Sequence, residues 1–260
     1  MSTKLLVQRK NRVCFLTLNR PEVRNAVDTE TMSRIRAEIE ISEKDGTRVV
    51  VLSGSGGAFS SGADIKAALQ NKLSPDEAYE VLLKTYTPTL LSIWNSSLPI
   101  VAAINGVAAG IGLNMALACD LRLASQNAKF SEIFIHVGLI PDGGGTFTLP
   151  RLVGMGRAME MVLTGNTVDA AEALEMGLVN RVYPEKEFES KVAQFAEFLA
   201  GQAPMALSRA KKAIHAALEG TFESALAQEA VHQKAIFQSE DGFEGFRAFL
   251  EKRRPKWKNP

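Results

Sequence analysis

Two stretches of mostly apolar residues constrain the fold of this chain more than any other feature. RVVVLSG at 48–54 and LPIVAAING at 98–106 carry apolar residues in succession, without polar alternation. A strand of this kind is buried on both faces, which is typical of a parallel sheet covered by helices on both sides. VCFLTLNR at 13–20 and LRLAS at 121–125 also have strand composition. The sequence therefore predicts an α/β fold.

Segments with helical patterns separate these strands. Asp28 is a typical N-cap residue for the amphipathic segment 29–46. The segment 65–97 is expected to be helical with a proline-marked break after Ser74, and 110–120 is expected to form another helix. Strands that alternate with helices in this way favour parallel pairing.

The pattern changes after about residue 150. This part is expected to be almost entirely helical, with one strand at LVNRVYP, 178–184, and two longer helical segments at its end. We therefore expect a core of residues 1–200 that carries the functional site, and a helical region of residues 201–260. Such an appendage often buries its apolar stripe on a neighbouring subunit, so we expect the second region to serve oligomerisation.

Composition excludes several classes of protein. The 260 residues are 46% hydrophobic, enough for a large buried core. Lys and Arg (30) balance Asp and Glu (29), so no global charge favours nucleic acid or an anionic membrane as partner. Cys14 and Cys119 lie in apolar contexts and are too few for a disulfide framework or a zinc site. With no signal peptide and no apolar run of roughly 18 residues, we expect a cytoplasmic protein without membrane spans.

Two glycine-rich segments follow the apolar strands. GSGGAFSSGAD (the first glycine-rich segment, 54–64) and AINGVAAGIG (the second glycine-rich segment, 103–112) permit backbone conformations that leave amide groups free of a strand ladder. Two such turns that face each other could form an oxyanion hole. Neither segment matches a P-loop or a dinucleotide fingerprint, and two ordinary tight connections are the alternative.

Five motifs in order resemble the enoyl-CoA hydratase/isomerase, or crotonase, superfamily over essentially the whole chain. They are NRPEVRNAVD (19–28), GAFSSGADIK (57–66), INGVAAGIGLNMALACDLRLAS (104–125), VGLIPDGGGTFTLPRLVG (137–154) and AAEALEMGLVNRVYP (170–184). The resemblance implies a crotonase-like spiral of repeated ββα units with a helical C-terminal trimerisation region. It also implies a homotrimer or a dimer of trimers, and an acyl-CoA thioester as substrate, with no separate cofactor and no metal.

The resemblance also implies which residues form the site. The amides of Ala63 and Ile111 correspond to the pair that holds the thioester oxygen, although the second position usually carries glycine. Arg24 and Lys66 correspond to residues that contact the CoA phosphates. Further substrate contacts are expected at Ala26, Ser61, Gly62, Asp64, Ile65, Gly110, Asn114, Phe134 and Pro141.

The residues that would add water are replaced in this chain. Hydratases of the superfamily use two glutamates, and the corresponding positions here hold Asn114 and Phe134. Asp142, in GLIPDGGGT, occupies the position where the ring-epoxide isomerase of phenylacetyl-CoA breakdown and the dienoyl-CoA isomerases carry a catalytic aspartate. Without the resemblance, Pro-Asp-Gly would indicate an ordinary turn. One carboxylate suits proton transfer between two carbons, so we expect an isomerase with Asp142 as its proton shuttle.

Other titratable residues of the chain have interpretations outside catalysis, and two other functions are possible. Glu132 is expected to be a solvated surface carboxylate, and His136 a structural or surface residue. His215 and His232 are expected on helices with solvated neighbours, without metal-ligand spacing. The basic tail FLEKRRPKWKNP could reach a CoA phosphate of a neighbouring subunit or simply be solvated. An enoyl-CoA hydratase is the alternative activity, and a non-catalytic acyl-CoA-binding protein is the alternative class.

Overall fold

A computed structural model describes residues 3–66 and 72–258 of the chain. Its body is built on a six-stranded sheet in the order β1-β2-β3-β5-β7-β10. All neighbours from β2 onward pair in parallel, and β1 adds to the edge as an antiparallel hairpin with β2. The strands are β1 (Leu5–Lys10), β2 (Val13–Leu18), β3 (Val49–Gly54), β5 (Ile100–Ile104), β7 (Leu121–Ser125) and β10 (Arg181–Tyr183). The predicted parallel sheet is confirmed, whereas β1 was not predicted.

A second, four-stranded sheet holds the strands that the sequence did not reveal. Its order is β4 (Ala58–Ser60), β6 (Val107–Ala109), β8 (Lys129–Ser131) and β9 (Val168–Asp169). β3 and β4, β5 and β6, and β7 and β8 each place their first strand in the large sheet and their second in the small one. Helical segments follow each pair, so the chain winds through repeated ββα units, as predicted for the crotonase fold.

Helices cover both faces of the large sheet, as the apolar strands require. The core on one face is formed with α9, whose Phe188, Val192 and Ala196 pack with strand residues such as Val49 and Val101. The other face carries the larger core cluster, to which α1, α4 and α5 contribute. The helices of the body are α1 (Thr29–Ser42), α3 (Pro75–Val81), α4 (Thr87–Asn95), α5 (Ile111–Leu117), α6 (Gly145–Val153), α7 (Met155–Thr164), α8 (Ala170–Glu175) and α9 (Phe188–Ala200). Short helical turns are η1 (Pro21–Val23), η2 (Leu82–Tyr86), η3 (Ile133–Val137) and η4 (Glu185–Glu187).

Several local predictions hold in detail. Asp28 caps α1, because its side chain accepts a hydrogen bond from the amide of Thr31. Ser74 begins α3 with a capping box that includes Glu77. Cys14 and Cys119 are buried free thiols.

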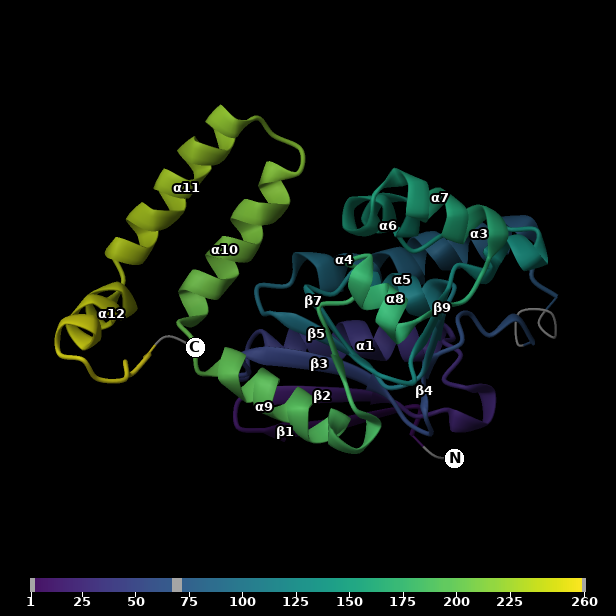
Figure 1. Ribbon diagram of the computed structural model, residues 1–260, viewed down its shortest axis with the longest axis horizontal. Coiled ribbons are helices and arrows are strands. Elements are labelled where there is room, and N and C mark those ends of the chain that lie inside the picture. The colour runs from purple at the N-terminus through teal and green to yellow at the C-terminus, as the bar shows by residue number, and fades with distance from the viewer. Residues whose placement is uncertain (1–2, 67–71, 259–260) are drawn as a thin grey trace.

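The C-terminal arm consists of α10 (Pro204–Ala217), α11 (Phe222–Phe237) and α12 (Glu240–Leu250), three helices where two were expected. Figure 1 shows the arm projecting from the body, with α11 beside α10 and α12 at the lower end of α11, level with the start of α10. Phe222, Phe249 and Leu250 are each about four-fifths exposed. An apolar surface of this extent is typical of a contact with another protein, and the trimer or dimer of trimers stays a prediction. No helix in the described part of the chain combines the length and apolar character of a membrane span.

Candidate active site

The two glycine-rich segments lie side by side because the short strands inside them pair. β4 in the first segment runs parallel to β6 in the second. A Cβ atom placed on Gly62 would lie 3.1 Å from the carbonyl oxygen of Ala109 and 3.9 Å from the Cα of Gly110. The backbones that follow the two strands are therefore in close contact, and the turns meet at one end of the small sheet.

The amide of Ala63 is directed away from its neighbouring strand. Val27 donates its N–H to the carbonyl of Gly62 (2.8 Å), and Asp64 donates its N–H to the carbonyl of Val27 (3.0 Å). In a parallel bridge of this kind, the residue between the two bonded positions turns its own N–H to the other side. Within the described residues that N–H donates no hydrogen bond, so it is available to a ligand.

The amide of Ile111 is the first of α5, so it has no partner inside the helix. Gly110 precedes it with φ 53° and ψ −133°, a conformation that a residue with a side chain would adopt only with strain. The Ile111 side chain fills the space beside Gly143, since a Cβ placed there would lie 3.0 Å from its Cγ1. The departure from glycine at this position therefore adds apolar volume next to the Asp142 loop.

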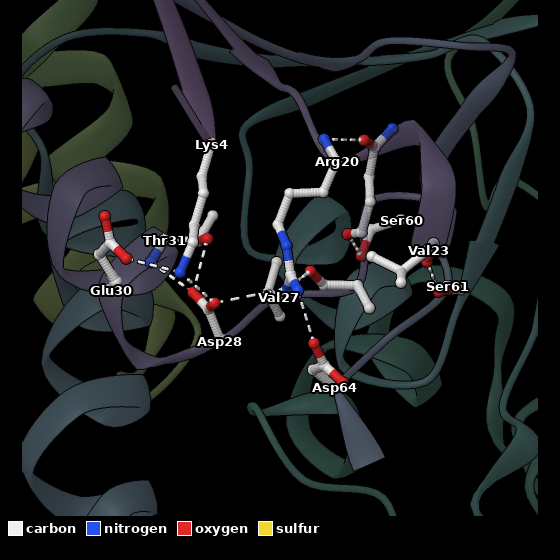
Figure 2. A network of polar contacts seen from close by, with 12 residues as sticks. Lys4, Arg20, Val23, Val27, Asp28, Glu30, Thr31, Ser60, Ser61 and Asp64 are labelled. Atoms are coloured by element: carbon white, nitrogen blue, oxygen red, sulfur yellow. Dashed lines mark hydrogen bonds and ion pairs between the residues drawn. The ribbon is translucent and has the colours of Figure 1, made fainter. Parts of the chain in front are cut away.

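An ion-pair network holds the first segment in place (Figure 2). Arg20 donates to the carbonyl of Ala26 and to the Asp64 carboxylate, each at 2.7 Å, and lies 3.5 Å from Asp28. Asp28 in turn forms an ion pair with Lys4, with 2.7 Å between Oδ2 and Nζ. The guanidinium thus fixes residues on both sides of the Val27–Ala63 bridge and the orientation of the Ala63 amide.

The residues expected to contact CoA lie along the same edge. The carbonyl of Arg24 accepts a hydrogen bond from the amide of Ser61 (2.9 Å), which joins the NRPE turn to the first glycine-rich segment. The side chains of Arg24, Ile65 and Lys66 are exposed, whereas Ala26 is buried. Two cations therefore face solvent next to the first glycine-rich segment, a suitable environment for phosphate groups.

Asp142 lies in the loop between η3 and α6, after the buried Pro141. Its carbonyl accepts hydrogen bonds from the Asn114 side chain (2.8 Å) and the Gly145 amide (3.2 Å). The Oδ1 atom of its carboxyl group is buried and has no hydrogen-bond partner among the described residues. Burial raises the pKa of this carboxyl to about 6.

Glu132 is buried, and the expectation of a solvated surface carboxylate is wrong. Its side chain is enclosed with 0% exposure, and Asn114 Nδ2 lies 3.4 Å from its Oε2. Burial raises the pKa of Glu132 to about 7, and the charge of Asp142 adds to the shift. β8 ends at Ser131 and Glu132 occupies the N-cap position of η3 without a capping hydrogen bond, so strand alternation does not govern where this side chain points. One signal was available, because Glu132 is the only charged side chain in FSEIFI, 130–135.

Of the two positions of the hydratase glutamates, Asn114 contacts the Asp142 loop and Phe134 lies beside Gly110. Asn114 is fully buried and reaches both Glu132 and the Asp142 carbonyl. Phe134 lies in η3 rather than in a strand, and its ring packs against Gly110. A Cβ atom on Gly145 would lie 2.4 Å from Asn114 Oδ1. The Asn114 amide thus occupies space that only a glycine at 145 leaves free.

An apolar cavity of about 260 Å³ adjoins the Asp142 loop. Gly143 and Gly144 form one wall, Leu91 and Trp94 of α4 another, and Phe147 of α6 a third. Phe147 meets the Trp94 ring edge-on, with 5.8 Å between ring centroids. The lining of this apolar cavity begins with Gly143, the residue directly after Asp142.

The histidines and the basic tail lie outside this cluster. His136 is exposed and bonds through Nε2 to the carbonyl of Thr164 (3.1 Å), as expected for a structural residue. His232 contacts Arg209. His215 stacks on Trp94 with 4.1 Å between centroids, so the expectation of solvated neighbours is wrong for it. In the tail, Arg253 is held by Glu244 of the same chain at 2.6 and 2.9 Å.

The family model for enoyl-CoA hydratase/isomerase matches residues 8–260. The chain belongs to the enoyl-CoA hydratase/isomerase family. A probable enoyl-CoA hydratase of Rhodobacter capsulatus is 42% identical over 243 residues, which cover 94% of this chain and 93% of that protein. The 2,3-dehydroadipyl-CoA hydratase of Escherichia coli is 35% identical and covers 98% of this chain, with 99% of its own length matched.

Solved structures of the enoyl-CoA hydratase/isomerase family share this fold. The crystal structure of an enoyl-CoA hydratase from Bacillus anthracis superposes with a TM-score of 0.94 at 32% identity, over 99% of this chain and 100% of that one. The relatives named here are hydratases, so their names do not support the narrower resemblance to isomerases. That resemblance depends on Asp142 and on the residues at 114 and 134.

Proposed function

We propose that this chain is an acyl-CoA isomerase in which Asp142 moves a proton along a thioester enolate. The observation that carries the proposal is the half-buried carboxyl of Asp142, whose Oδ1 atom is enclosed without a hydrogen-bond partner among the described residues and whose pKa is raised to about 6. A group with this pKa is ionised at neutral pH, yet remains basic enough to accept a proton from carbon and return it. Asn114 and Phe134 supply no carboxylate at the hydratase positions.

The proposed reaction needs no group beyond those in this cluster. Asp142 removes a proton from the α-carbon, and the electron pair of that C–H bond moves onto the thioester oxygen as the enolate forms. The amides of Ala63 and Ile111 stabilise this oxygen, and each such donor typically lowers the barrier by roughly 3–4 kcal/mol. The enolate electrons then take the same proton back at the γ-carbon, so the C=C bond moves and atoms and charge balance.

The position of the aspartate favours the isomerase types that the sequence resembles. A shift of a C=C bond in an enoyl- or dienoyl-CoA, or the rearrangement of a ring epoxide in an aromatic CoA ester, would use the same base and the same oxyanion donors. The cavity bounded by Trp94 and Phe147 suits an apolar or aromatic acyl group.

Hydration is the second candidate activity. The names of the relatives favour it, and Glu132 brings a second carboxyl near Asp142 in place of the missing glutamates. Crotonyl-CoA hydration and 3-enoyl-CoA isomerisation, measured side by side on one preparation, separate the two activities. Isomerisation that exceeds hydration is the expected result.

The variant Asp142→Asn tests the proposal, with Asp76→Asn as the matched control on the exposed first turn of α3. We expect Asp142→Asn to abolish isomerisation while acyl-CoA binding, measured by calorimetry, is retained. The control should keep both properties. Unchanged turnover in Asp142→Asn would refute the assignment, and binding without turnover in the unmodified protein would indicate a non-catalytic acyl-CoA-binding protein.

A further inference from the structure

Glu132 is a fully enclosed carboxyl that the proposed reaction does not use. Carboxyl groups are rarely buried completely unless a cation or several donors meet them. Among the described residues no Lys, Arg or His forms an ion pair with Glu132. The only hydrogen bond to this side chain comes from Asn114, at 3.4 Å, again within the described part of the chain.

Asn114 links this carboxyl to the Asp142 loop. Its Nδ2 group donates both to Oε2 of Glu132 (3.4 Å) and to the carbonyl of Asp142 (2.8 Å). Three buried oxygens of the cluster have no donor within the described residues, namely Glu132 Oε1, Asn114 Oδ1 and Asp142 Oδ1. An ionised carboxylate only accepts hydrogen bonds, whereas a protonated carboxyl group carries a donor of its own. A proton on one carboxyl is therefore the donor that the cluster itself can supply.

We propose that Glu132 is a positioning residue for Asp142. Glu132 acts as a neutral carboxylic acid, which stays protonated while Asp142 is ionised. In this state Asp142 carries the only negative charge among Glu132, Asn114 and Asp142. Asn114 holds the Asp142 loop in place through its hydrogen bond to the Asp142 carbonyl. Loss of the Glu132 proton would place a second negative charge beside the enolate and weaken catalysis. The inference rests on the proposed function, because it takes Asp142 as the base.

The electrostatics of the pair give the order in which the protons leave. Burial raises the pKa of Asp142 to about 6. Burial raises that of Glu132 further, to about 7, with the charge of Asp142 contributing. Because Glu132 is completely enclosed whereas Asp142 keeps some contact with water, Asp142 ionises first as the pH rises, and Glu132 follows. Activity should rise with pH through about 6 and fall again through about 7.

The other titratable groups around Glu132 and Asp142 either are exposed to solvent or titrate far from neutral pH. α5, which packs on Glu132 through Asn114, carries no titratable side chain. Tyr86 of η2 senses the charge of Asp142, but burial raises its pKa far above neutral. The remaining charged or titratable side chains on η3, α6 and α7 are exposed: His136, Arg151, Arg157 and Glu160.

The pH profile of kcat/KM in Glu132→Gln tests the inference, because glutamine keeps the shape of a neutral carboxyl and cannot ionise. The profile of the unmodified enzyme should have two limbs, a lower limb where kcat/KM rises through about pH 6 and an upper limb where it falls. Above about pH 7, kcat/KM should fall about tenfold per pH unit. Glu132→Gln should lose the upper limb and keep the lower. Glu160→Gln, on the exposed face of α7, is the control and should keep both. An upper limb that persists in Glu132→Gln, or is absent from the unmodified enzyme, would overturn the inference.

Infrared spectroscopy reads the Glu132 proton without turnover, so it also serves if Glu132→Gln fails to fold. A protonated-carboxyl band should vanish as the pH of the unmodified protein is raised through about 7. In Asp142→Asn its midpoint should fall, because the neighbouring charge is gone. If the midpoint of this band is the same in Asp142→Asn as in the unmodified protein, the proposed coupling between Glu132 and Asp142 is refuted. The proposed function fails separately, if Asp142→Asn retains turnover.

Discussion

Arg20 gives the sharpest test of how the fold positions the candidate oxyanion donor at Ala63. Its guanidinium lies between the Asp64 carboxylate and the Ala26 carbonyl, and the side chains of Arg20 and Asp64 are only 15% and 10% exposed. Breaking a buried ion pair by removing one partner costs about 3–5 kcal/mol. Because both side chains keep some contact with water, we expect Arg20→Met to lower the free energy of unfolding by about 3 kcal/mol.

The same substitution should also affect catalysis. If the Ala63 amide loses its orientation, the loss of one oxyanion donor lowers kcat/KM by about 100- to 1000-fold. Urea denaturation at fixed protein concentration measures the first effect, and steady-state kinetics with an acyl-CoA measures the second. Arg36→Met is the control, because its ion pair with Glu40 is about half exposed and should contribute no more than about 0.5 kcal/mol. An Arg20→Met protein that unfolds like this control and turns over normally would refute the reasoning.

Two further substitutions probe the neighbouring walls of the site. Gly145→Ala places a methyl group 2.4 Å from Asn114 Oδ1, so kcat should fall about 100-fold in steady-state assays. Gly156→Ala is the control, because there is open space around Gly156, and it should leave kcat unchanged. Leu91→Trp narrows the 260 Å³ cavity, so KM should rise about tenfold for long acyl chains and stay constant for short ones across a chain-length series. Equal KM changes at every chain length would place the acyl group elsewhere.

The large sheet and its helices could be predicted because their signals are long. The apolar runs at 48–54 and 98–106 and the cap at Asp28 each rest on several residues, and each appears where it was expected. The small sheet was missed because its strands have two or three residues, too few to show a period. The run at 98–106 reaches the turn at Gly106, where a Cβ would lie 1.9 Å from the carbonyl oxygen of Gly57, and β6 begins just beyond it.

The candidate site likewise has one part that the sequence predicted and one part that it did not. Asp142 and the two glycine-rich segments were identified from motifs, and the structure brings them together through the pairing of β4 with β6 and the contact between Ile111 and Gly143. Glu132 was misplaced because its position depends on where β8 ends, and a single residue after a strand carries no periodic signal. Its burial is a tertiary property, set by the packing of α5 against the Asp142 loop.

A crystal structure of the protein with a saturated acyl-CoA, which has no C=C bond to move, tests the central claim most directly. The thioester oxygen should lie within about 3 Å of the amide nitrogens of both Ala63 and Ile111. The Asp142 carboxyl should face the α- and γ-carbons of the acyl chain. A thioester oxygen that reaches only one of the two nitrogens, or an Asp142 side chain turned away from the chain, would contradict the account.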